Sequence, residues 1–509
     1  MKTKSSIKNS IASIIQYVVV LLVGFVSQKM FINILGIDYL GLNGLFSNIV
    51  GMLGIVELGV GSAIIYNLYK PIVNNDTKTV NALMKFYKKS YYVIAIAILI
   101  IGLSIIPFLN FIIKDINIDI NIILVYVLFI LEIVSSYILS YKRSILYADQ
   151  KNYIINIIHI IYYILLNVVQ LIYLYLTKNY YGYLIIKIIF RFLENLVITI
   201  YVNKNYNYLN DKKANKLDDA ILKDIKTKVN SLFLHKIGSF VVLGTDNIII
   251  SKYLGLSTVG LYSNYYLIID SINKLFSQAI TAVIPSIGHL LIEGNKEKNY
   301  VTFKRLRFIN FWIATFASVG ILIVIKPFIT IWLGTNYLLD DITLLVLVFN
   351  FYQKMMRSSF SSFKEAAGIY YEDRFIPILE SLSNIVFSIL LVKLVGLPGV
   401  FLGTIISGLW LWCYSYPKYV YKKLFDRTYI DYALETLGYI SVFLIIGCLS
   451  LIISNLSLVN SIWLSIFINI FIALVIPNLI IMVLYKQNDN YIYLKKLFIN
   501  IFKKCIGRE

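Results

Sequence analysis

The most constraining feature of the sequence is a series of apolar segments, each about as long as an α-helix that crosses a bilayer. Such a helix needs roughly 20 predominantly apolar residues. About fourteen segments qualify, at 11–35, 42–65, 90–113, 121–141, 153–176, 181–202, 229–251, 259–285, 307–333, 342–362, 375–393, 397–417, 433–453 and 459–485. Only 15% of the 509 residues are charged, against roughly a quarter in soluble domains. The sequence therefore predicts an all-α, polytopic membrane protein of about 14 transmembrane helices.

The charges between these segments indicate which side of the membrane each turn faces. Lys and Arg cluster in turns on one side of the chain's alternation, around 70–89, 142–151, 204–228, 296–307, 418–427 and 486–508, whereas the turns on the opposite side hold only Lys114, Lys178, Lys252 and Lys393. The positive-inside rule assigns the basic turns to the cytoplasm. We therefore expect a multi-pass protein of the cell membrane with both termini in the cytoplasm and an uncleaved first span. Because the net charge of +20 is divided among separate clusters, a nucleic-acid partner is not expected.

A polar stretch and an internal repeat divide the chain into two halves. Leu35-Gly36 and Leu40-Gly41-Leu42 recur as Leu254-Gly255 and Val259-Gly260-Leu261, at a spacing of about 219 residues. Each repeat holds six predicted spans, so we expect two lobes related by a pseudo-twofold axis along the membrane normal, with a cavity between them. The predicted organisation is an N-lobe at 1–202, a cytoplasmic linker at 203–228, a C-lobe at 229–420, two extra helices at 421–485 and a basic tail at 486–509.

Charged side chains inside the predicted spans are the strongest local sign of function. Each costs about 2.5–3.5 kcal/mol at the bilayer centre, so it needs a partner, water or a substrate. The basic members are in excess, which suggests a cationic cavity suited to a phosphate or pyrophosphate group. The candidates for substrate binding are Lys29, Arg191, Lys236, Lys274, Lys354 and Arg357, and the candidates for coupling to a proton or cation are Glu57, His235, Asp246 and Asp270.

Alternatively, some of these charged side chains neutralise each other as ion pairs. Arg191 with Glu194, and Asp270 with Lys274, have the spacing of ion pairs within one helix. In that interpretation these charges stabilise the helices and do not touch a substrate.

The motifs of several other chemistries are missing. The sequence has no GxxxxGK[ST] phosphate loop, no HExxH pair and no GxSxG elbow, and its cysteines, Cys413, Cys448 and Cys505, are scattered. We therefore expect no ATP hydrolysis, no metal site, no cofactor and no enzyme activity. Transport would draw on an ion gradient or on the membrane potential.

Several motifs together resemble one family of membrane proteins. They are Leu40–Phe46 (LGLNGLF), Glu57–Ala63 (ELGVGSA), Thr245–Ile250 (TDNIII), Gly260–Tyr265 (GLYSNY) and Lys364–Phe375 (KEAAGIYYEDRF). This combination resembles the Wzx-type polysaccharide repeat-unit flippases of the multidrug/oligosaccharidyl-lipid/polysaccharide exporter superfamily. The resemblance covers about the first 400 residues, and the last two spans match only in being hydrophobic.

The resemblance implies a function, a substrate and partners. A protein of this family moves an undecaprenyl-pyrophosphate-linked oligosaccharide from the cytoplasmic to the outer leaflet by alternating access between two six-helix lobes, and it works beside a polysaccharide polymerase and assembly proteins. The family often has arginine at the position of Lys29. Lysine keeps the charge there but loses the bidentate geometry of arginine.

Three alternative functions stay open at this point. A cation-coupled drug or metabolite antiporter of the same fold would be expected to place acids in its cavity, whereas this sequence has a basic excess. A flippase of the lipid-linked peptidoglycan precursor differs only in the cargo. A membrane polysaccharide polymerase is disfavoured because such enzymes carry a sizeable outer loop, and the predicted outer turns here are short.

Overall fold

The computed structural model describes residues 2–57, 59–114, 118–210, 217–281, 283–369, 372–456 and 461–505. Every regular element in these ranges is a helix, and none of the described residues forms a strand. The predicted all-α class is therefore confirmed. The chain divides into two compact units, Met1–Ser263 and Asn264–Glu509.

The helices of the first unit are long and joined by short turns. They are α1 (Lys2–Leu35), α2 (Ile37–Leu53), η1 (Gly54–Glu57), α3 (Val60–Val73), α4 (Thr77–Ser104), η2 (Ile106–Phe108), α5 (Leu109–Ile112), α6 (Ile122–Tyr137), η3 (Ser140–Lys142), α7 (Arg143–Ala148), α8 (Asn152–Thr177), α9 (Tyr180–Asn205), η4 (Asn207–Asn210), α10 (Asp219–Leu254) and the first turns of α11 (Leu256–Thr281). The first unit thus contains α10, which the sequence assigns to the C-lobe. The predicted lobe boundaries stay a prediction.

The second unit begins within α11. Its further helices are α12 (Ile284–Ile292), α13 (Lys296–Trp332), η5 (Thr335–Tyr337), α14 (Asp341–Ala366), α15 (Ile376–Val395), α16 (Leu397–Ser407), η6 (Trp410–Lys422), α17 (Lys423–Phe425), α18 (Tyr429–Leu456), α19 (Ile462–Tyr485) and α20 (Asp489–Cys505). The element η6 is a π-helix of 13 residues with Pro417 inside it. Wider turns of this kind occur mostly as short bulges inside α-helices and often mark functional sites.

Ten of the described helical segments are long and apolar enough to cross a membrane. Each overlaps one of the predicted spans. The four remaining predictions, 181–202, 229–251, 259–285 and 342–362, fall on α9, α10, α11 and α14, each a single helix of at least 26 residues. These four helices carry most of the charged candidates, which lowers their apolarity. The total of fourteen stays a prediction.

The internal repeat is visible in how the helices begin. Gly36 and Gly255 share an unusual backbone conformation, with φ of +99° and +91°, that is open only to glycine. Two further pairs of helices start with a capping side chain at the same spacing of 219 residues, before α4 and α13 (Asp76 and Asn295) and before α6 and α14 (Asn121 and Asp340). Each cap accepts a hydrogen bond from the backbone N–H three residues on, which stabilises the helix start. The two halves are therefore built on one local plan.

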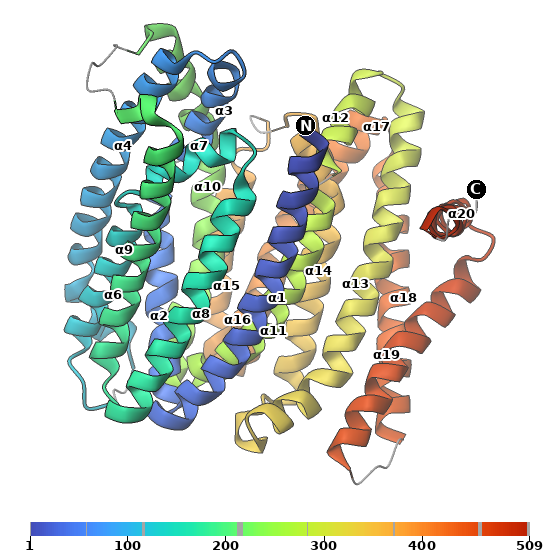
Figure 1. The fold of residues 1–509 in the computed structure, drawn as a ribbon. Coiled ribbons are helices and arrows are strands. Elements are labelled where there is room, and N and C mark those ends of the chain that lie inside the picture. Colours follow the sequence, from blue (N-terminus) through green and yellow to red (C-terminus); the bar gives the residue numbers. More distant parts are fainter. Residues whose placement is uncertain are drawn as a thin grey trace. The chain divides into compact units, whose positions relative to one another are not determined.

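The core of the first unit lies where α3, α4, α7 and α9 meet. Ile64, Leu83, Ile145 and Ile198 are fully buried there, one from each of these helices. α1 lies beside α8 and packs against it (Figure 1). Several large apolar side chains along α1, among them Ile14, Leu22 and Val26, are exposed, as expected of a helix that borders lipid.

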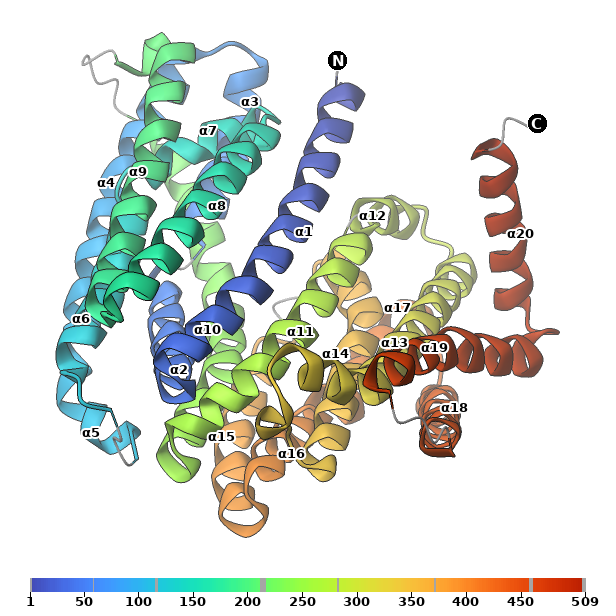
Figure 2. The same ribbon diagram turned by 60° about the horizontal axis from the view of Figure 1, so that its bottom comes forward.

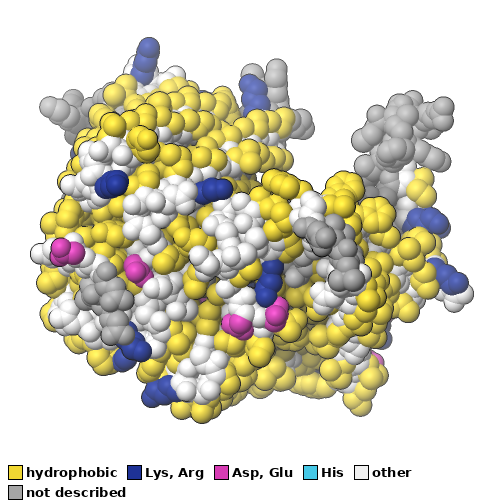
Figure 3. Space-filling model, turned by 90° about the horizontal axis from the view of Figure 1, so that it is seen from below, with side chains coloured by type: hydrophobic (Ala, Val, Ile, Leu, Met, Phe, Trp, Pro, Cys, Tyr) yellow, Lys and Arg dark blue, Asp and Glu magenta, His cyan; other side chains and the backbone are white. Residues whose placement is uncertain are grey.

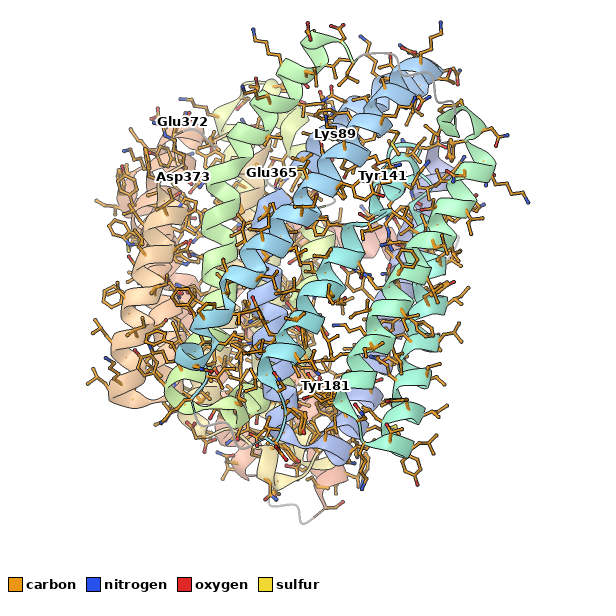
Figure 4. The ribbon with its side chains drawn as sticks, turned by 90° about the vertical axis from the view of Figure 1, so that its left-hand side faces the viewer. Lys89, Tyr141, Tyr181, Glu365, Glu372 and Asp373 are labelled. Atoms are coloured by element: carbon orange, nitrogen blue, oxygen red, sulfur yellow. The ribbon has the colours of Figure 1, made fainter. Side chains whose placement is uncertain are left out.

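The ends of the helices in the first unit agree with the predicted alternation of turns. Figure 4 shows Tyr141 and Tyr181 toward opposite ends of this bundle, with Lys89 toward the same end as Tyr141. The sequence places Lys89 and Tyr141 in basic turns and Tyr181 beside a turn with a single lysine. The alternation of basic and non-basic ends is therefore consistent with the predicted topology of this unit.

In the second unit, α13 is the central helix and packs against α14, α18 and α19. α19 is followed by α20, which turns away from it (Figure 2). Tyr491 and Leu494 of α20 are buried, and Tyr491 stacks on Trp312 of α13, while Lys495 and Lys496 are exposed. The predicted basic tail is thus an amphipathic helix, a form suited to the membrane surface.

Charged side chains are sparse on the end of the molecule seen in Figure 3. Basic and acidic groups lie scattered among hydrophobic and uncharged polar ones on that face, and in one place a basic group lies beside acidic ones. That face therefore has no continuous basic surface. This agrees with the interpretation that the positive net charge follows from the positive-inside rule.

Candidate functional site

The second predicted span is broken near its middle. α2 ends at Leu53, the tighter turn η1 follows, and Gly59, with φ of +80°, precedes α3. A break inside a span leaves backbone groups without helical partners, and discontinuous helices are a common way to build ion sites in transporters. Glu57 is the last residue of η1, so a carboxylate stands at this break.

Two tyrosines of α4 hold the Glu57 side chain. The Tyr91 hydroxyl donates to Oε1 of Glu57 at 2.8 Å, and the Tyr87 hydroxyl donates to that of Tyr91 at 2.7 Å. Gly61 lies directly against this group, because an added Cβ would collide with Oε1 of Glu57 and lie 2.7 Å from the Tyr87 hydroxyl. The carboxylate is thus held by the neutral hydroxyl of Tyr91 in a tightly packed place.

A second cluster in the first unit is centred on Glu194 of α9, which is 4% exposed. Arg143 of α7 donates to its Oε1 at 2.8 Å, His159 of α8 lies 3.1 Å from the same oxygen, and Arg191 lies 3.4 Å from Oε2. Arg143 also donates to Asn195, at 2.7 and 3.0 Å. Three helices therefore contribute to one charged network.

This network keeps a positive charge beyond what Glu194 neutralises. Two guanidinium groups face one carboxylate, and the Arg191 side chain is 36% exposed with a buried Nε that has no hydrogen-bond partner in the described part of the chain. Nearby on α9, Lys187 lies 3.6 Å from Glu132 of α6. The predicted Arg191–Glu194 pair is present, yet Arg191 retains exposed surface and donor capacity for an anion.

In the second unit, the two basic residues of α14 at 357 and 364 have acidic partners. Arg357 pairs with Glu380 of α15, and Lys364 pairs with Asp373 and donates to Ser415 at 2.9 Å. Glu372 and Asp373, in the turn after α14, are labelled in Figure 4. The charge of Arg357 is therefore balanced locally, and a substrate would have to compete with Glu380.

The other candidates of the second unit lie on α11 and α14. Lys274 pairs with Asp270 at 2.6 Å, as the helical spacing predicts, and its side chain is 57% exposed. Lys354 is exposed on α14.

The remaining candidates belong to the first unit. Lys29 is exposed on α1 and forms no ion pair with the described side chains. Asp246 of α10 is partly buried, next to Asn247, which donates to the Gly44 carbonyl at 3.2 Å. The side chains of His235 and Lys236 lie outside the described residues.

The structure also reveals a buried charged residue in a segment that the sequence predicts to be a basic turn. Arg307 of α13 is fully buried. It donates to Glu435 at 3.0 Å and Thr436 at 2.7 Å, both on α18, and to the hydroxyl of Tyr421 on η6. These partners follow more than 110 residues later, so no local pattern could have predicted them. The contacts of Arg143 and His159 with Glu194 also join different helices, 51 and 35 residues apart, so the sequence does not predict them either.

No group of three or more His, Cys, Asp or Glu side chains suited to a metal ion occurs among the described residues. The charged clusters are built from arginine, lysine, tyrosine and single carboxylates, a set that suits anions and protons more than transition metals.

A family model described as polysaccharide biosynthesis protein matches residues 34–339, more than half of the chain. The chain belongs to this polysaccharide biosynthesis family. The match covers the Glu57 break and the Glu194 cluster and ends before Arg357. The resemblance inferred from the motifs is thus confirmed at the level of the family. A search of curated proteins finds no match.

Solved structures show the fold of this family member. A lipid II flippase, MurJ, in an inward closed conformation is similar with a TM-score of 0.67 and 15% identity, over 94% of this chain and 99% of that one. An inward-facing multidrug resistance MATE family transporter of the MOP superfamily reaches a TM-score of 0.56 at 16% identity, over 80% and 94%. A Vibrio cholerae MATE transporter reaches 0.55 at 13% identity, over 84% and 100%. The polysaccharide biosynthesis protein therefore has the fold of these membrane proteins.

Proposed function

We propose that this protein is a flippase that moves an undecaprenyl-pyrophosphate-linked oligosaccharide repeat unit from the inner to the outer leaflet for surface polysaccharide synthesis. The observation that carries the proposal is the combination of a polysaccharide biosynthesis family match with a flippase-like fold along nearly the whole of both chains. In this proposal the protein is not an enzyme, and it catalyses no change in the covalent structure of its cargo.

The charge distribution supports an anionic cargo. Arg143 and Arg191 exceed the one carboxylate that they share, and Arg191 is partly exposed. A pyrophosphate offers several oxygens to such donors, and charge-assisted hydrogen bonds of this kind are among the stronger polar interactions. Lys29 adds a second exposed cation in the same unit. We propose that these groups meet the pyrophosphate, and that the other cationic candidates, Lys236, Lys274, Lys354 and Arg357, line its path.

Energy for the cycle would come from an ion gradient. Glu57 is the coupling group that the geometry favours, because it stands at a break in a span and is held by neutral hydroxyls. His235, Asp246 and Asp270 remain further candidates. In this scheme protonation or cation binding at Glu57 is coupled to the change between inward and outward access.

A cation-coupled antiporter for drugs or metabolites is the second candidate, and the same Glu57 carboxylate favours it, since it would attract a cation. The basic excess around Glu194 argues against a cationic drug as the cargo. A lipid-linked peptidoglycan precursor would satisfy the same chemistry as the proposed cargo, so only a direct measurement of the transported lipid separates these two.

The deciding experiment measures on which leaflet lipid-linked oligosaccharide accumulates in cells that lack this protein. Labelled repeat units should collect on the cytoplasmic leaflet, with surface polysaccharide lost, and expression of the intact chain should restore both. Expression of an Arg191→Gln variant should restore neither, while Lys178→Gln, in an outer turn, serves as the matched control. Repeat units that reach the outer face without being polymerised would indicate a polymerase. Unchanged pools of repeat units, with peptidoglycan precursor trapped inside or with drug efflux lost, would indicate one of the other two cargoes.

A further inference from the structure

Lys142, the last residue of η3, is a buried lysine with few partners. It is 6% exposed, and its ammonium group donates to Oδ1 of Asn203 on α9 at 2.7 Å, which uses one of three N–H donors. No carboxylate of the described residues pairs with it, and the charged neighbour that acts on it, Lys88 of α4, is positive as well. Their neighbours in sequence, Lys89 and Tyr141, lie toward the same end of the first unit in Figure 4. A buried charge without a counter-charge is costly, so an added anion would stabilise Lys142.

The corresponding lysine of the second repeat has an acidic partner. Ser362–Lys364 (SFK) follows Ser140–Lys142 (SYK) by 222 residues, close to the spacing of the repeat. Lys364 pairs with Asp373, whereas the acceptor beside Lys142 is the neutral amide of Asn203. The anion is therefore built into the second repeat and is missing from the described part of the first.

The break in the chain that places Lys142 is held from α9. Leu139, just before η3, has φ of +68°, a left-handed conformation that is strained for leucine. Asn195 of α9 donates to two backbone carbonyls just before this break, at 3.1 and 3.3 Å. Eight residues further along α9, Asn203 accepts from Lys142. Strained backbone persists only where its surroundings determine it, and it clusters at ligand sites, so the burial of Lys142 is a fixed feature of this turn.

One face of α4 leads from these two lysines toward the hydrocarbon of the membrane. Lys88, Tyr92, Ile96 and Ile100 follow one another at four-residue spacing, and all four are exposed. The Lys88 ammonium lies 5.9 Å from the centre of the Tyr92 ring. A lysine, then a tyrosine, then aliphatic side chains is the order in which a membrane helix passes from the headgroups to the acyl chains. Because η3 packs against α4, Lys142 lies beside the headgroup end of this face.

We propose that Lys142 and Lys88 bind the phosphate of an anionic phospholipid in the predicted inner leaflet, with its acyl chains against the exposed isoleucines of α4. The phosphate oxygens accept the remaining N–H groups of Lys142, and the phosphate provides the counter-charge that Asp373 provides for Lys364. The apolar face of α4 favours a lipid over free phosphate, because only a lipid gains from contact with it. Basic pockets between helices on the cytoplasmic side of membrane proteins bind acidic headgroups in this way. The lipid stays in the membrane, so the proposal is independent of what the protein transports.

The first test measures binding of phosphatidylglycerol to the purified intact chain in a neutral detergent, by native mass spectrometry, with phosphatidylcholine of the same acyl chains as the comparison lipid. Lys142→Gln should lower the affinity for phosphatidylglycerol by about tenfold, the loss of one charged hydrogen bond, and should leave that for phosphatidylcholine unchanged. The amide of this variant can still donate to Asn203, so the fold should be kept. Lys78→Gln removes the same charge from an exposed position at the start of α4 and should change neither affinity. An unchanged affinity of Lys142→Gln for phosphatidylglycerol would overturn the proposal.

The second test supplies the missing acid within the protein. Asn203→Asp places a carboxylate where Lys142 now donates to an amide, so it should raise the thermal unfolding midpoint in detergent that contains no anionic lipid. Phosphatidylglycerol should raise the midpoint of the unmodified chain, because it binds the folded form, and should no longer raise that of Asn203→Asp. A full response of Asn203→Asp to phosphatidylglycerol would contradict the proposal. An equal rise for the unmodified chain with inorganic phosphate would show that the ligand is the free anion, and the assignment to a lipid would be wrong.

Discussion

The buried Arg307 offers a direct test of what holds the second unit together. Its guanidinium group is fully buried on α13 and donates to Glu435 and Thr436 of α18 and to Tyr421 of η6. It also lies over the ring of Phe360, at 4.9 Å. Removing the carboxylate by Glu435→Ala would leave a buried charge with neutral partners only. We expect the free energy of unfolding to fall by a large amount.

The structure sets the size of that loss. Breaking a buried ion pair by removing one partner costs about 3–5 kcal/mol. The Glu435 side chain is 29% exposed, so water screens the pair in part, and the lower end of the range, about 3 kcal/mol, applies. An apolar replacement of both partners, Arg307→Met with Glu435→Leu, removes the uncompensated charge. It should recover most of the loss, because such replacements are often neutral.

The assay is unfolding by SDS in mixed micelles, followed for each variant. The matched control is Glu297→Ala, which breaks the pair between Glu297 and Arg427, where Glu297 is 68% exposed. An exposed pair contributes at most about 1 kcal/mol. A loss for Glu435→Ala no greater than that of the control, or a double variant no more stable than Glu435→Ala alone, would refute the reasoning.

Three further predictions concern transport and are read as surface polysaccharide relative to protein level in the membrane. Glu57→Gln should leave the protein level unchanged and abolish transport, and normal transport by this variant would exclude Glu57 from the mechanism. Gly61→Ala should reduce transport in part, because its added methyl group displaces the Glu57 carboxylate. Arg357→Glu should lower the protein level, because it places two carboxylates side by side. The double variant Arg357→Glu with Glu380→Arg restores an opposite-charge pair and should restore the protein level but not transport. Recovery of both would show that Arg357 serves the ion pair alone. Lys29→Gln should reduce transport by about tenfold, a loss equal to one charged hydrogen bond, and Lys29→Arg should retain it.

The sequence determined the features that depend on neighbouring residues. Hydropathy over a window of about 20 residues indicated where the helices run, and the described helices overlap all the predicted spans. Capping residues and glycines that start the helices, such as Gly36 and Gly255, carried the repeat at a constant spacing. The motifs also led to the family. Each of these signals is local, since helix formation and membrane insertion respond to a short stretch of chain.

Only the tertiary structure decided which charges meet. From the sequence alone, Arg191 can either pair with Glu194 or bind a substrate. The structure shows that Arg143 and His159 contact the same carboxylate from two other helices. The sequence places Arg307 at a basic turn, whereas its partners on α18 and η6 make it a buried centre of the second unit. The close approach of Gly41 in α2 to the backbone of Leu256 in α11 likewise required coordinates. The physical reason is that such contacts depend on how each helix is rotated and how closely it packs, and these are set by many distant residues at once.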